Sequence, residues 1–363
     1  MNTPPPDPRN FKGRGATANP ANPFEALHLE DDPEWLEELA RDPGAVPPSP
    51  RTVLYNDDTQ SLITKNTSPD LSFEFSLNPY RGCEHGCAYC YARRYHEFLG
   101  WSSGLDFESK LLVKPRAPEL LRAELQKKSW HAGKLACSGV TDCYQPVERR
   151  LKITRGCLEV LAEFRQPVVL ITKNHLITRD VDHLQELAKW KAGAALISVT
   201  TLDPSLAAAL EPRASSPRMR LAAVRTLTDA GVPVGVSVAP IIPGLNDHEI
   251  PAILAAARDA GAQFATYSII RLPGSVADVF QHWLARNVSP EAADKILRRI
   301  RDLRGGKLNE LRPGIRMRGE GELAEQIGRI FKVTARRLGL DKMRPDVTGE
   351  NFRRIEGRQM ELF

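Results

Sequence analysis

Short apolar runs alternate with longer amphipathic segments between Leu71 and Leu272. The apolar runs predict strands at Ser72–Leu77, Lys134–Cys137, Pro167–Thr172, Ala194–Thr201, Val232–Ala239 and Gln263–Ile270. The segments between them have apolar residues at helical spacing and predict helices at Ala117–Gln126, Arg149–Phe164, Asp180–Trp190, Arg218–Asp229 and Asp247–Ala260. Strands that alternate with helices indicate repeated right-handed βα units and a parallel sheet. The pattern therefore predicts an α/β fold, with a partial or full βα barrel or an open doubly wound sheet as candidate architectures.

Polar segments follow five of the predicted strands, at residues 78–90, 138–148, 173–175, 200–204 and 239–247. In barrels and in open parallel sheets, ligands bind at the carboxyl ends of the strands, where these connecting loops meet. We therefore expect one functional site built from these segments.

The two flanks of this region differ from it in composition. Residues 1–50 contain eleven of the 28 prolines, have a net charge of −5 and include the run Lys12-Gly13-Arg14-Gly15. This composition predicts a mostly disordered arm, followed by a lead-in segment at residues 51–70. Residues 273–363 have helical patterns, and residues 291–363 have a net charge of +6. They predict a basic helical C-terminal module. Its charge indicates either a surface that binds a polyanion such as nucleic acid or an ordinary helical surface exposed to solvent.

Composition limits the class of protein. The chain has 363 residues, 42% of them hydrophobic, which is enough to bury a large core. We find no run of 18 or more apolar residues, and the first thirty residues lack the basic start and apolar centre of a signal peptide. The six cysteines do not form the evenly spaced framework of a disulfide-rich secreted domain. We therefore expect a cytoplasmic protein with no membrane span.

Three cysteines occupy eight positions in the segment RGCEHGCAYCY, at Cys83, Cys87 and Cys90. Three thiolates on one loop can each bind one iron of a 4Fe-4S cluster, which leaves the fourth iron open to a ligand. The alternative is structural zinc, which needs four ligands and usually takes them from two spaced pairs. His85 lies inside the loop and no second CxxC pair exists, so the spacing favours the iron-sulfur cluster over zinc.

The cysteine spacing, with an aromatic residue before the last cysteine and a place after the first predicted strand, resembles the signature of the radical S-adenosylmethionine (SAM) superfamily. The longer string Tyr80-x-Gly82-Cys83-x-His85-x-Cys87-x-Tyr89-Cys90-Tyr91 resembles its spore photoproduct lyase and DNA repair photolyase-like branch. The segment Ser138 to Glu148 is also similar to that branch. The resemblance spans residues 71–272 and implies a radical SAM core domain, a partial (βα)6 barrel of the TIM type. Its cofactors would be a 4Fe-4S cluster and S-adenosyl-L-methionine, and its partner a low-potential electron donor of the flavodoxin or ferredoxin type.

The resemblance also implies cofactor-binding roles for five residues. Tyr89 matches the aromatic residue that lies against the adenine of SAM, and Thr141 and Asp142 match polar positions at the methionine amino end. Asp142 has the alternative role of capping the turn before Pro146. Lys173 and Ser198 match positions that meet the SAM carboxylate, although Ser198 also suits a small residue that fills a barrel layer.

Two further residues have implied catalytic roles. Tyr91 matches a tyrosine that takes part in radical relay. Cys137 lies near the position of the cysteine that returns hydrogen to the substrate radical, but two residues farther from the aspartate. That departure favours a plain buried cysteine at this position.

The sequence thus predicts a radical SAM enzyme that cleaves SAM reductively to a 5′-deoxyadenosyl radical. The resemblance and the basic C-terminal module together favour nucleic acid as the substrate, in lyase-like DNA repair or modification. Modification of a protein, a transfer RNA or a small metabolite is the alternative within the superfamily. An alternative from another class is a non-catalytic iron-sulfur or zinc protein.

Overall fold

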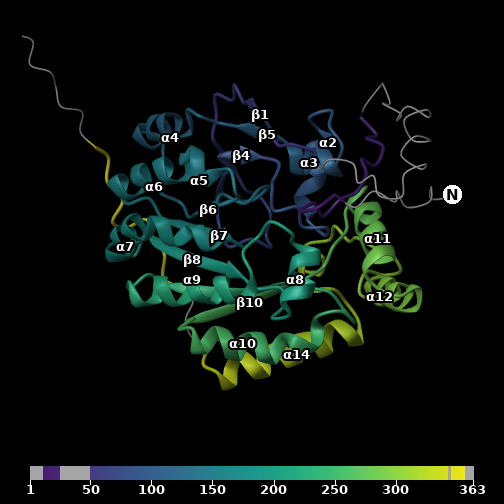
Figure 1. Cartoon of the computed structure of the whole chain (residues 1–363). Coiled ribbons are helices and arrows are strands. Elements are labelled where there is room, and N and C mark those ends of the chain that lie inside the picture. Colours follow the sequence, from purple (N-terminus) through teal and green to yellow (C-terminus); the bar gives the residue numbers. More distant parts are fainter. Residues whose placement is uncertain (1–10, 25–49, 342–344, 356–363) are drawn as a thin grey trace, which may run out of the picture.

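The computed structural model describes residues 11–24, 50–341 and 345–355 (Figure 1). Its centre is a seven-stranded sheet in the order β10-β9-β8-β7-β6-β3-β2. These strands are β2 (Ile63–Lys65), β3 (Phe75–Leu77), β6 (Leu135–Cys137), β7 (Val168–Thr172), β8 (Gly193–Ser198), β9 (Val234–Ile241) and β10 (Phe264–Ile269). Strands β3 and β6 to β10 are parallel, and β2 pairs with β3 in the antiparallel sense. No pairing joins β10 to β2 among the described residues, so the six parallel strands form the expected partial (βα)6 barrel.

Helices follow the parallel strands and cover the outer face of the sheet (Figure 1). They are α4 (Ala117–Gln126), α5 (Glu148–Leu151), α6 (Ile153–Phe164), α7 (Val181–Lys189), α8 (Pro204–Leu210), α9 (Pro217–Asp229) and α10 (Ile250–Asp259). The helix predicted at Arg149–Phe164 is split into α5 and α6 at Lys152, whose φ of 56° breaks the helical path. A 3-10 turn at Asp247–Glu249 precedes α10, and α8 was not predicted.

A second, small sheet lies beside the barrel and is not predicted from the sequence (Figure 1). It has the order β1-β5-β4, formed by β1 (Val53–Asn56), β5 (Lys110–Val113) and β4 (Tyr80–Arg81). The short helices α2 (Arg94–Glu97) and α3 (Leu105–Ser109) lie beside it (Figure 1). The lead-in segment therefore supplies one strand to each sheet, β1 to the small sheet and β2 to the barrel.

Residues 11–24 correct the expectation of a disordered arm. Phe11, Arg14, Thr17 and Asn22 in this segment are buried against the domain. Arg14 donates to the backbone carbonyl of Glu108 at 2.6 Å, so the segment is fastened by polar contacts that composition does not reveal. Residues 1–10 and 25–49, which complete the predicted arm, lie outside the described residues.

The C-terminal helices share the hydrophobic core of the barrel. They are α11 (Val276–Asn287), α12 (Pro290–Asp302), α13 (Ile315–Arg318) and α14 (Glu322–Arg337), and α14 packs on α10. Phe280, Ile300 and Phe331 belong to the same buried cluster as the strand residues. The described part of the expected module is thus continuous with the domain, because its apolar faces are buried on the barrel. No described helix is long and apolar enough to cross a membrane.

Candidate radical SAM site

The three clustered cysteines lie on a loop that follows β4 and crosses the carboxyl edge of the sheet. Backbone hydrogen bonds fasten both ends of this loop: the amide of Cys83 donates to Phe107 at 2.9 Å, and that of Ala88 donates to Leu210 at 3.0 Å. Gly86 has a φ of +67°, a conformation that a residue with a side chain rarely adopts. We refer to residues 83–90 as the cysteine loop.

A buried ion pair supports the cysteine loop from behind. Arg93 donates through Nε to the carbonyl of Cys87 at 2.9 Å, and its Nη2 contacts Oε1 of Glu108 at 2.5 Å. Both side chains have no exposed surface. The pair therefore fixes the backbone of the loop from the 3-10 turn at Tyr91–Arg93 and from α3, since a buried charge is stable only with a close partner of opposite charge.

The thiols of the cysteine loop suit a cluster of several irons. Cys83 and Cys87 are buried and Cys90 is half-buried, and burial raises the pKa of the Cys83 and Cys90 thiols. A thiolate in such surroundings needs a nearby cation, and iron supplies one. No three His, Cys, Asp or Glu side chains within the described residues are placed to share a single metal ion. A 4Fe-4S cluster requires a different arrangement of ligands, in which each thiolate binds its own iron.

Tyr89 is anchored by a buried ion pair at the other side of the loop. Its hydroxyl donates to Oε1 of Glu211, which also accepts from Thr200 at 2.6 Å. Arg220 forms an ion pair with the second oxygen of Glu211, and both side chains are almost fully buried. Desolvation acts to raise the pKa of Glu211, but the charges of Arg220 and Lys173 and the hydrogen bonds from Arg220 and Thr200 together lower it to about 2. The ring of Tyr89 is thereby held in one orientation, with the Lys173 ammonium 5.8 Å from its centroid.

Asp142 uses its carboxylate to join the ends of neighbouring strands. It accepts from the Thr172 hydroxyl at 2.7 Å and from the Lys173 amide at 2.9 Å, both at the end of β7. His85 of the cysteine loop lies 3.3 Å away through Nδ1. The adjacent charge of His85 and these hydrogen bonds lower the pKa of Asp142 to about 2 despite its burial. Thr141 donates to the carbonyl of Gly82 at 2.6 Å, so both predicted residues hold the loop in place.

Comparison with known proteins decides the family. The model of the radical SAM superfamily matches residues 77–257, which include the whole cysteine loop. An uncharacterized protein of Mycobacterium tuberculosis is 34% identical over 235 residues, which cover 64% of this chain and 68% of that protein. The chain belongs to the radical SAM superfamily. It is a radical SAM enzyme, and membership implies a 4Fe-4S cluster, SAM and a reductant that supplies electrons.

Other relatives of this radical SAM enzyme agree with its fold. An uncharacterized protein of Methanocaldococcus jannaschii is 28% identical over 226 residues, covering 61% of this chain and 79% of that one. The structure of spore photoproduct lyase complexed with dinucleoside spore photoproduct superposes with a TM-score of 0.58 at 16% identity, over 78% of this chain and 79% of that chain. A mutant of that lyase with bound AdoMet and the same photoproduct gives a TM-score of 0.57, at 16% identity over 79% of each chain. The likeness shows that the radical SAM fold is shared.

The remaining predicted residues of the radical SAM site lie at different depths. Ser198 is buried at the end of β8, in register with Ser237 of β9, and its carbonyl accepts from Arg220 at 3.2 Å. Tyr91 is 37% exposed, and its hydroxyl donates to the carbonyl of Gly139 at 2.7 Å. The Arg271 guanidinium lies 4.3 Å from the centroid of the Tyr91 ring. Tyr91 therefore faces the open side of the barrel, beside the last cysteine of the loop.

Cys137 lies in the hydrophobic core at the end of β6, together with Cys143 and Cys157. Its side chain is 2% exposed, and Leu135 on the same face of the strand belongs to the same core. Its carbonyl accepts from the Cys143 thiol at 3.8 Å. This placement favours the plain buried cysteine over a hydrogen donor, because a donor must reach the substrate.

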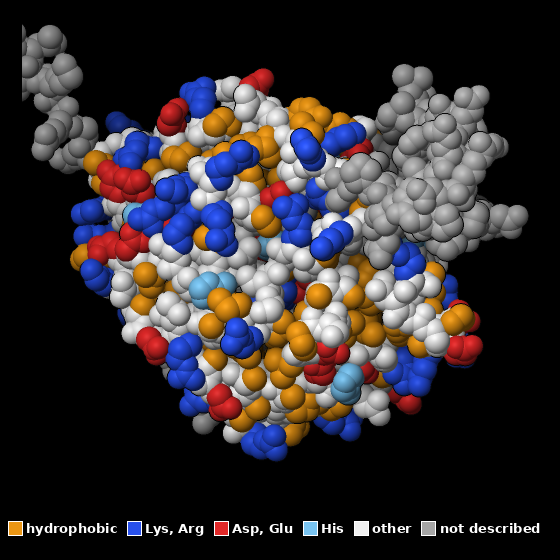
Figure 2. Space-filling view, in the orientation of Figure 1, with side chains coloured by type: hydrophobic (Ala, Val, Ile, Leu, Met, Phe, Trp, Pro, Cys, Tyr) orange, Lys and Arg blue, Asp and Glu red, His pale blue; other side chains and the backbone are white. Residues whose placement is uncertain are grey.

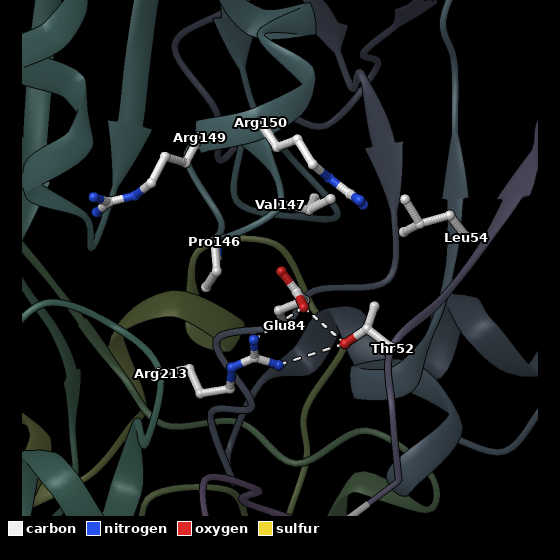
Figure 3. A pocket seen from close by; sticks show the side chains of 8 residues that line it. All are labelled: Thr52, Leu54, Glu84, Pro146, Val147, Arg149, Arg150 and Arg213. Carbon is white, nitrogen blue, oxygen red and sulfur yellow. Dashed lines mark hydrogen bonds and ion pairs between the residues drawn. The ribbon is translucent and has the colours of Figure 1, made fainter.

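A cavity of about 320 Å³ lies against the outer side of the cysteine loop (Figure 3). Glu84, between the first cysteine and His85, forms its floor and contacts Arg213 at 3.1 Å and Thr52 at 2.7 Å. Arg149 and Arg150 of α5 project from the opposite wall (Figure 3). A second cavity, of about 410 Å³, shares Arg149. Three arginines and one glutamate line the first cavity, which makes it cationic, and Figure 2 shows many Lys and Arg side chains on the same face of the molecule.

Sequence reasoning missed the buried charges that support this site. Arg93, Glu108, Glu211 and Arg220 belong to no recognisable motif, and their partners lie up to 15 positions away in the chain. The signal that could have found them is a charged residue inside an otherwise apolar segment, as with Glu108 between Phe107 and the strand at Lys110–Val113. Such a residue needs a buried partner of opposite charge.

Proposed function

We propose that this radical SAM enzyme cleaves SAM reductively and acts on nucleic acid, in a lyase-like repair or modification. Cys83, Cys87 and Cys90 would each hold one iron of the 4Fe-4S cluster. When bound, the cluster and SAM supply the one-electron cleavage that releases methionine and a 5′-deoxyadenosyl radical. The chain itself would position the cofactors and limit the access of water, since Cys83, Cys87 and the side chains behind the loop are buried.

Lys173 and Tyr89 are the side chains best placed to hold SAM. The Lys173 ammonium makes a single 3.4 Å hydrogen bond, to the carbonyl of Ala239, among the described residues. It can therefore pair with the SAM carboxylate, while the anchored ring of Tyr89 offers a face to the adenine. We assign Ser198 a hydroxyl contact with the same carboxylate, and we assign Asp142 and Thr141 to positioning, because their polar groups already bind the protein.

The observation that supports nucleic acid is the stacking of Arg271 on Tyr91. Arg271 makes no hydrogen bond to the described residues, so its guanidinium keeps its donors for a ligand such as a phosphate. Tyr91 follows Cys90 directly in the chain, so the Arg271 guanidinium over its ring is close to the cysteine loop. An arginine and an exposed ring together suit a nucleotide, whose phosphate and base they can contact.

The basic loop at residues 304–321 contributes less to binding than its composition suggests. Arg312 pairs with Glu310 and Glu320, and Arg316 pairs with Asp70. Arg304 is buried and donates to four backbone carbonyls. These three arginines already have partners within the protein. Arg271, which makes no hydrogen bond to the described residues, is therefore the better candidate for contact with a phosphate.

Fluorescence anisotropy with labelled duplex DNA, single-stranded DNA and transfer RNA tests this proposal. Loss of one phosphate contact in Arg271→Gln should reduce the slope of log K against log salt by about 0.7 to 0.9. Arg258→Gln is the matched control, because Arg258 is exposed near the end of α10. Absence of binding at low salt would refute a nucleic-acid substrate, and would favour a protein side chain or a small metabolite. Preference for transfer RNA would identify the other nucleic-acid alternative.

Cofactor chemistry is tested separately by anaerobic reconstitution and reduction with dithionite. We expect iron and sulfide at a 4:4 ratio and formation of 5′-deoxyadenosine from SAM. A protein with a full cluster that releases no 5′-deoxyadenosine would contradict the cleavage step. A colourless protein with one zinc ion would instead support a non-catalytic role.

We propose that the electron donor is an acidic flavodoxin or ferredoxin that docks over the cationic cavity. Arg149 and Arg150 are exposed there, and Glu84 on the floor of the cavity adjoins Cys83. Charge reversal in Arg149→Glu/Arg150→Glu should slow 5′-deoxyadenosine formation with the protein donor, more at low salt than at high salt. The rate with dithionite should not change. Equal rates with the protein donor would refute this docking surface.

We also propose that the enzyme acts in the cytoplasm. All six cysteines are free, and the reducing cytoplasm keeps thiols in this state.

A further inference from the structure

The N-terminal segment at residues 11–24, which we call the strap, lies directly on the cysteine loop. The amides of Gly15 and Ala16 donate to the two carboxylate oxygens of Glu108, at 3.0 and 2.8 Å. Glu108 is the same residue that pairs with Arg93 behind the loop. One buried carboxylate thus binds the strap and the arginine that holds the carbonyl of Cys87.

Gly15 makes the closest approach. A Cβ atom added to Gly15 would lie 1.7 Å from the carbonyl oxygen of Gly86 and 3.3 Å from the amide of Ala88. Two backbones therefore touch at this point, between the first and second cysteines of the loop. Only glycine allows such an approach, because any other residue would force the strap and the loop apart.

Arg14 fastens the strap to the other elements around the loop. Its guanidinium donates to the carbonyl of Glu108 at 2.6 Å and to that of Pro50 at 2.5 Å, and it lies 3.4 Å from the Thr52 hydroxyl. Thr52 donates in turn to Glu84 of the cysteine loop at 2.7 Å. Arg14 is 8% exposed, although it belongs to a segment rich in proline and glycine. A long cationic side chain is rarely buried so far unless its hydrogen bonds fix something in place.

We propose that the strap is a cover for the side of the cysteine loop at Gly86 and Ala88, away from the cationic cavity, and that Arg14 and Gly15 are positioning residues for the cluster ligands. The strap holds the loop in its closed form and keeps water and small oxidants from the thiols on that side. This inference rests on the proposed function for the use of the loop, but the fit of the strap on the loop does not depend on it.

Alkylation of the protein without cofactors tests the cover directly. The rates at which iodoacetamide modifies each cysteine are measured by mass spectrometry in the full chain. We expect Cys83, Cys87 and Cys90 to react at least about tenfold faster in Arg14→Met, which loses buried charge-assisted hydrogen bonds, and in Gly15→Ala, whose added Cβ would clash with the Gly86 carbonyl. Arg14→Lys should fall between the native protein and Arg14→Met.

The chain supplies matched controls for this experiment. Lys12→Ala changes an exposed residue of the strap and should leave all rates unchanged. The buried core cysteines Cys137, Cys143 and Cys157 report on opening of the whole domain. Unchanged rates at the cysteine loop in both Arg14→Met and Gly15→Ala would overturn the proposal. Equal acceleration at the core cysteines would also overturn it, since the strap would then only stabilise the fold as a whole.

The reconstituted protein provides a second measurement. If the cover shields the cluster, its visible absorbance should bleach in air about tenfold faster in Gly15→Ala than in Lys12→Ala. Equal bleaching would contradict shielding of the bound cluster. If the native protein formed no cluster at all, the proposed function would fail, whereas the alkylation result would still decide whether the strap covers the loop.

Discussion

The buried pair of Glu211 and Arg220 allows the most direct test of how the site is held together. Glu211→Gln keeps the size of the side chain but removes its charge, which leaves the Arg220 guanidinium buried without a counterion. The NH2 group of the new amide must also face either Tyr89 and Thr200, which donate to Oε1 of Glu211 in the native protein, or the Arg220 guanidinium, and each arrangement sets donor against donor. We therefore expect a lower free energy of unfolding, together with a Tyr89 side chain that is no longer held in one orientation.

Two independent routes give the size of this loss. Breaking a buried ion pair by removing one partner costs about 3 to 5 kcal/mol. The pKa of Glu211, lowered from 4.5 to about 2, corresponds to a preference of the folded state for the charged form of about 3 kcal/mol. Because the folded pKa lies below the unfolded one, this contribution is complete above pH 4.5 and is lost as the pH falls toward 2. We expect Glu211→Gln to lower the free energy of unfolding at pH 7 by about 3 kcal/mol.

Urea unfolding followed by tryptophan fluorescence measures this loss. Trp283 is a suitable reporter, because its indole donates to the carbonyl of Ala209, two residues before Glu211. The control is Glu186→Gln, which removes an exposed pair with Lys189 and should cost less than about 1 kcal/mol. The double variant Glu211→Leu/Arg220→Met should lose less than the sum of its two single variants. A loss in Glu211→Gln no larger than in the control would refute the reasoning.

Three further predictions concern other parts of the molecule. Burial lowers the pKa of His96 from 6.5 to about 4, so the native protein should lose up to about 3 kcal/mol as the pH falls from 6.5 to 4, and urea unfolding of His96→Phe should lack this slope. Arg304→Lys should cost about 2 kcal/mol in the same assay, because an ammonium cannot reach the four carbonyls that the guanidinium binds; an unchanged midpoint would contradict this. Cys87→Ser should lose iron on reconstitution with an unchanged circular dichroism spectrum, whereas Cys157→Ser, altered in the core, should retain it.

The fold could be predicted where a pattern extends over one element. All six parallel strands were found, because buried strands of this kind are nearly continuous apolar runs between helices. The small sheet was missed because its strands are two to four residues long, too short to show any periodicity. The strap was misjudged for a different reason. Its composition is typical of disorder, but its polar backbone is satisfied by Glu108, more than ninety positions away.

The residues of the site also fall into those that a local motif predicts and those whose contacts are distant in the chain. The cysteine loop is a local motif, so its position and its place after the first barrel strand were correctly located. The role of Asp142 depends on groups from two other segments, His85 and the end of β7, and no pattern within residues 138–148 shows that its oxygens are already used. Cys137 is a candidate by its place in the chain, and burial alone does not decide its role, because all three residues of β6 are buried.

The distribution of charge explains why Lys173 is the strongest candidate for contact with SAM. Arg93 is neutralised by Glu108, and Arg220 by Glu211, so the buried charges on the two sides of the cysteine loop cancel in pairs. Lys173 is left with one long hydrogen bond and the face of Tyr89. Its charge also acts on Glu211, but it forms no direct ion pair among the described residues, and in surroundings of low polarity such an ammonium favours an anionic ligand more than it would in water. We therefore expect Lys173 to pair with the carboxylate of a ligand next to the loop, since Glu211 is already paired with Arg220.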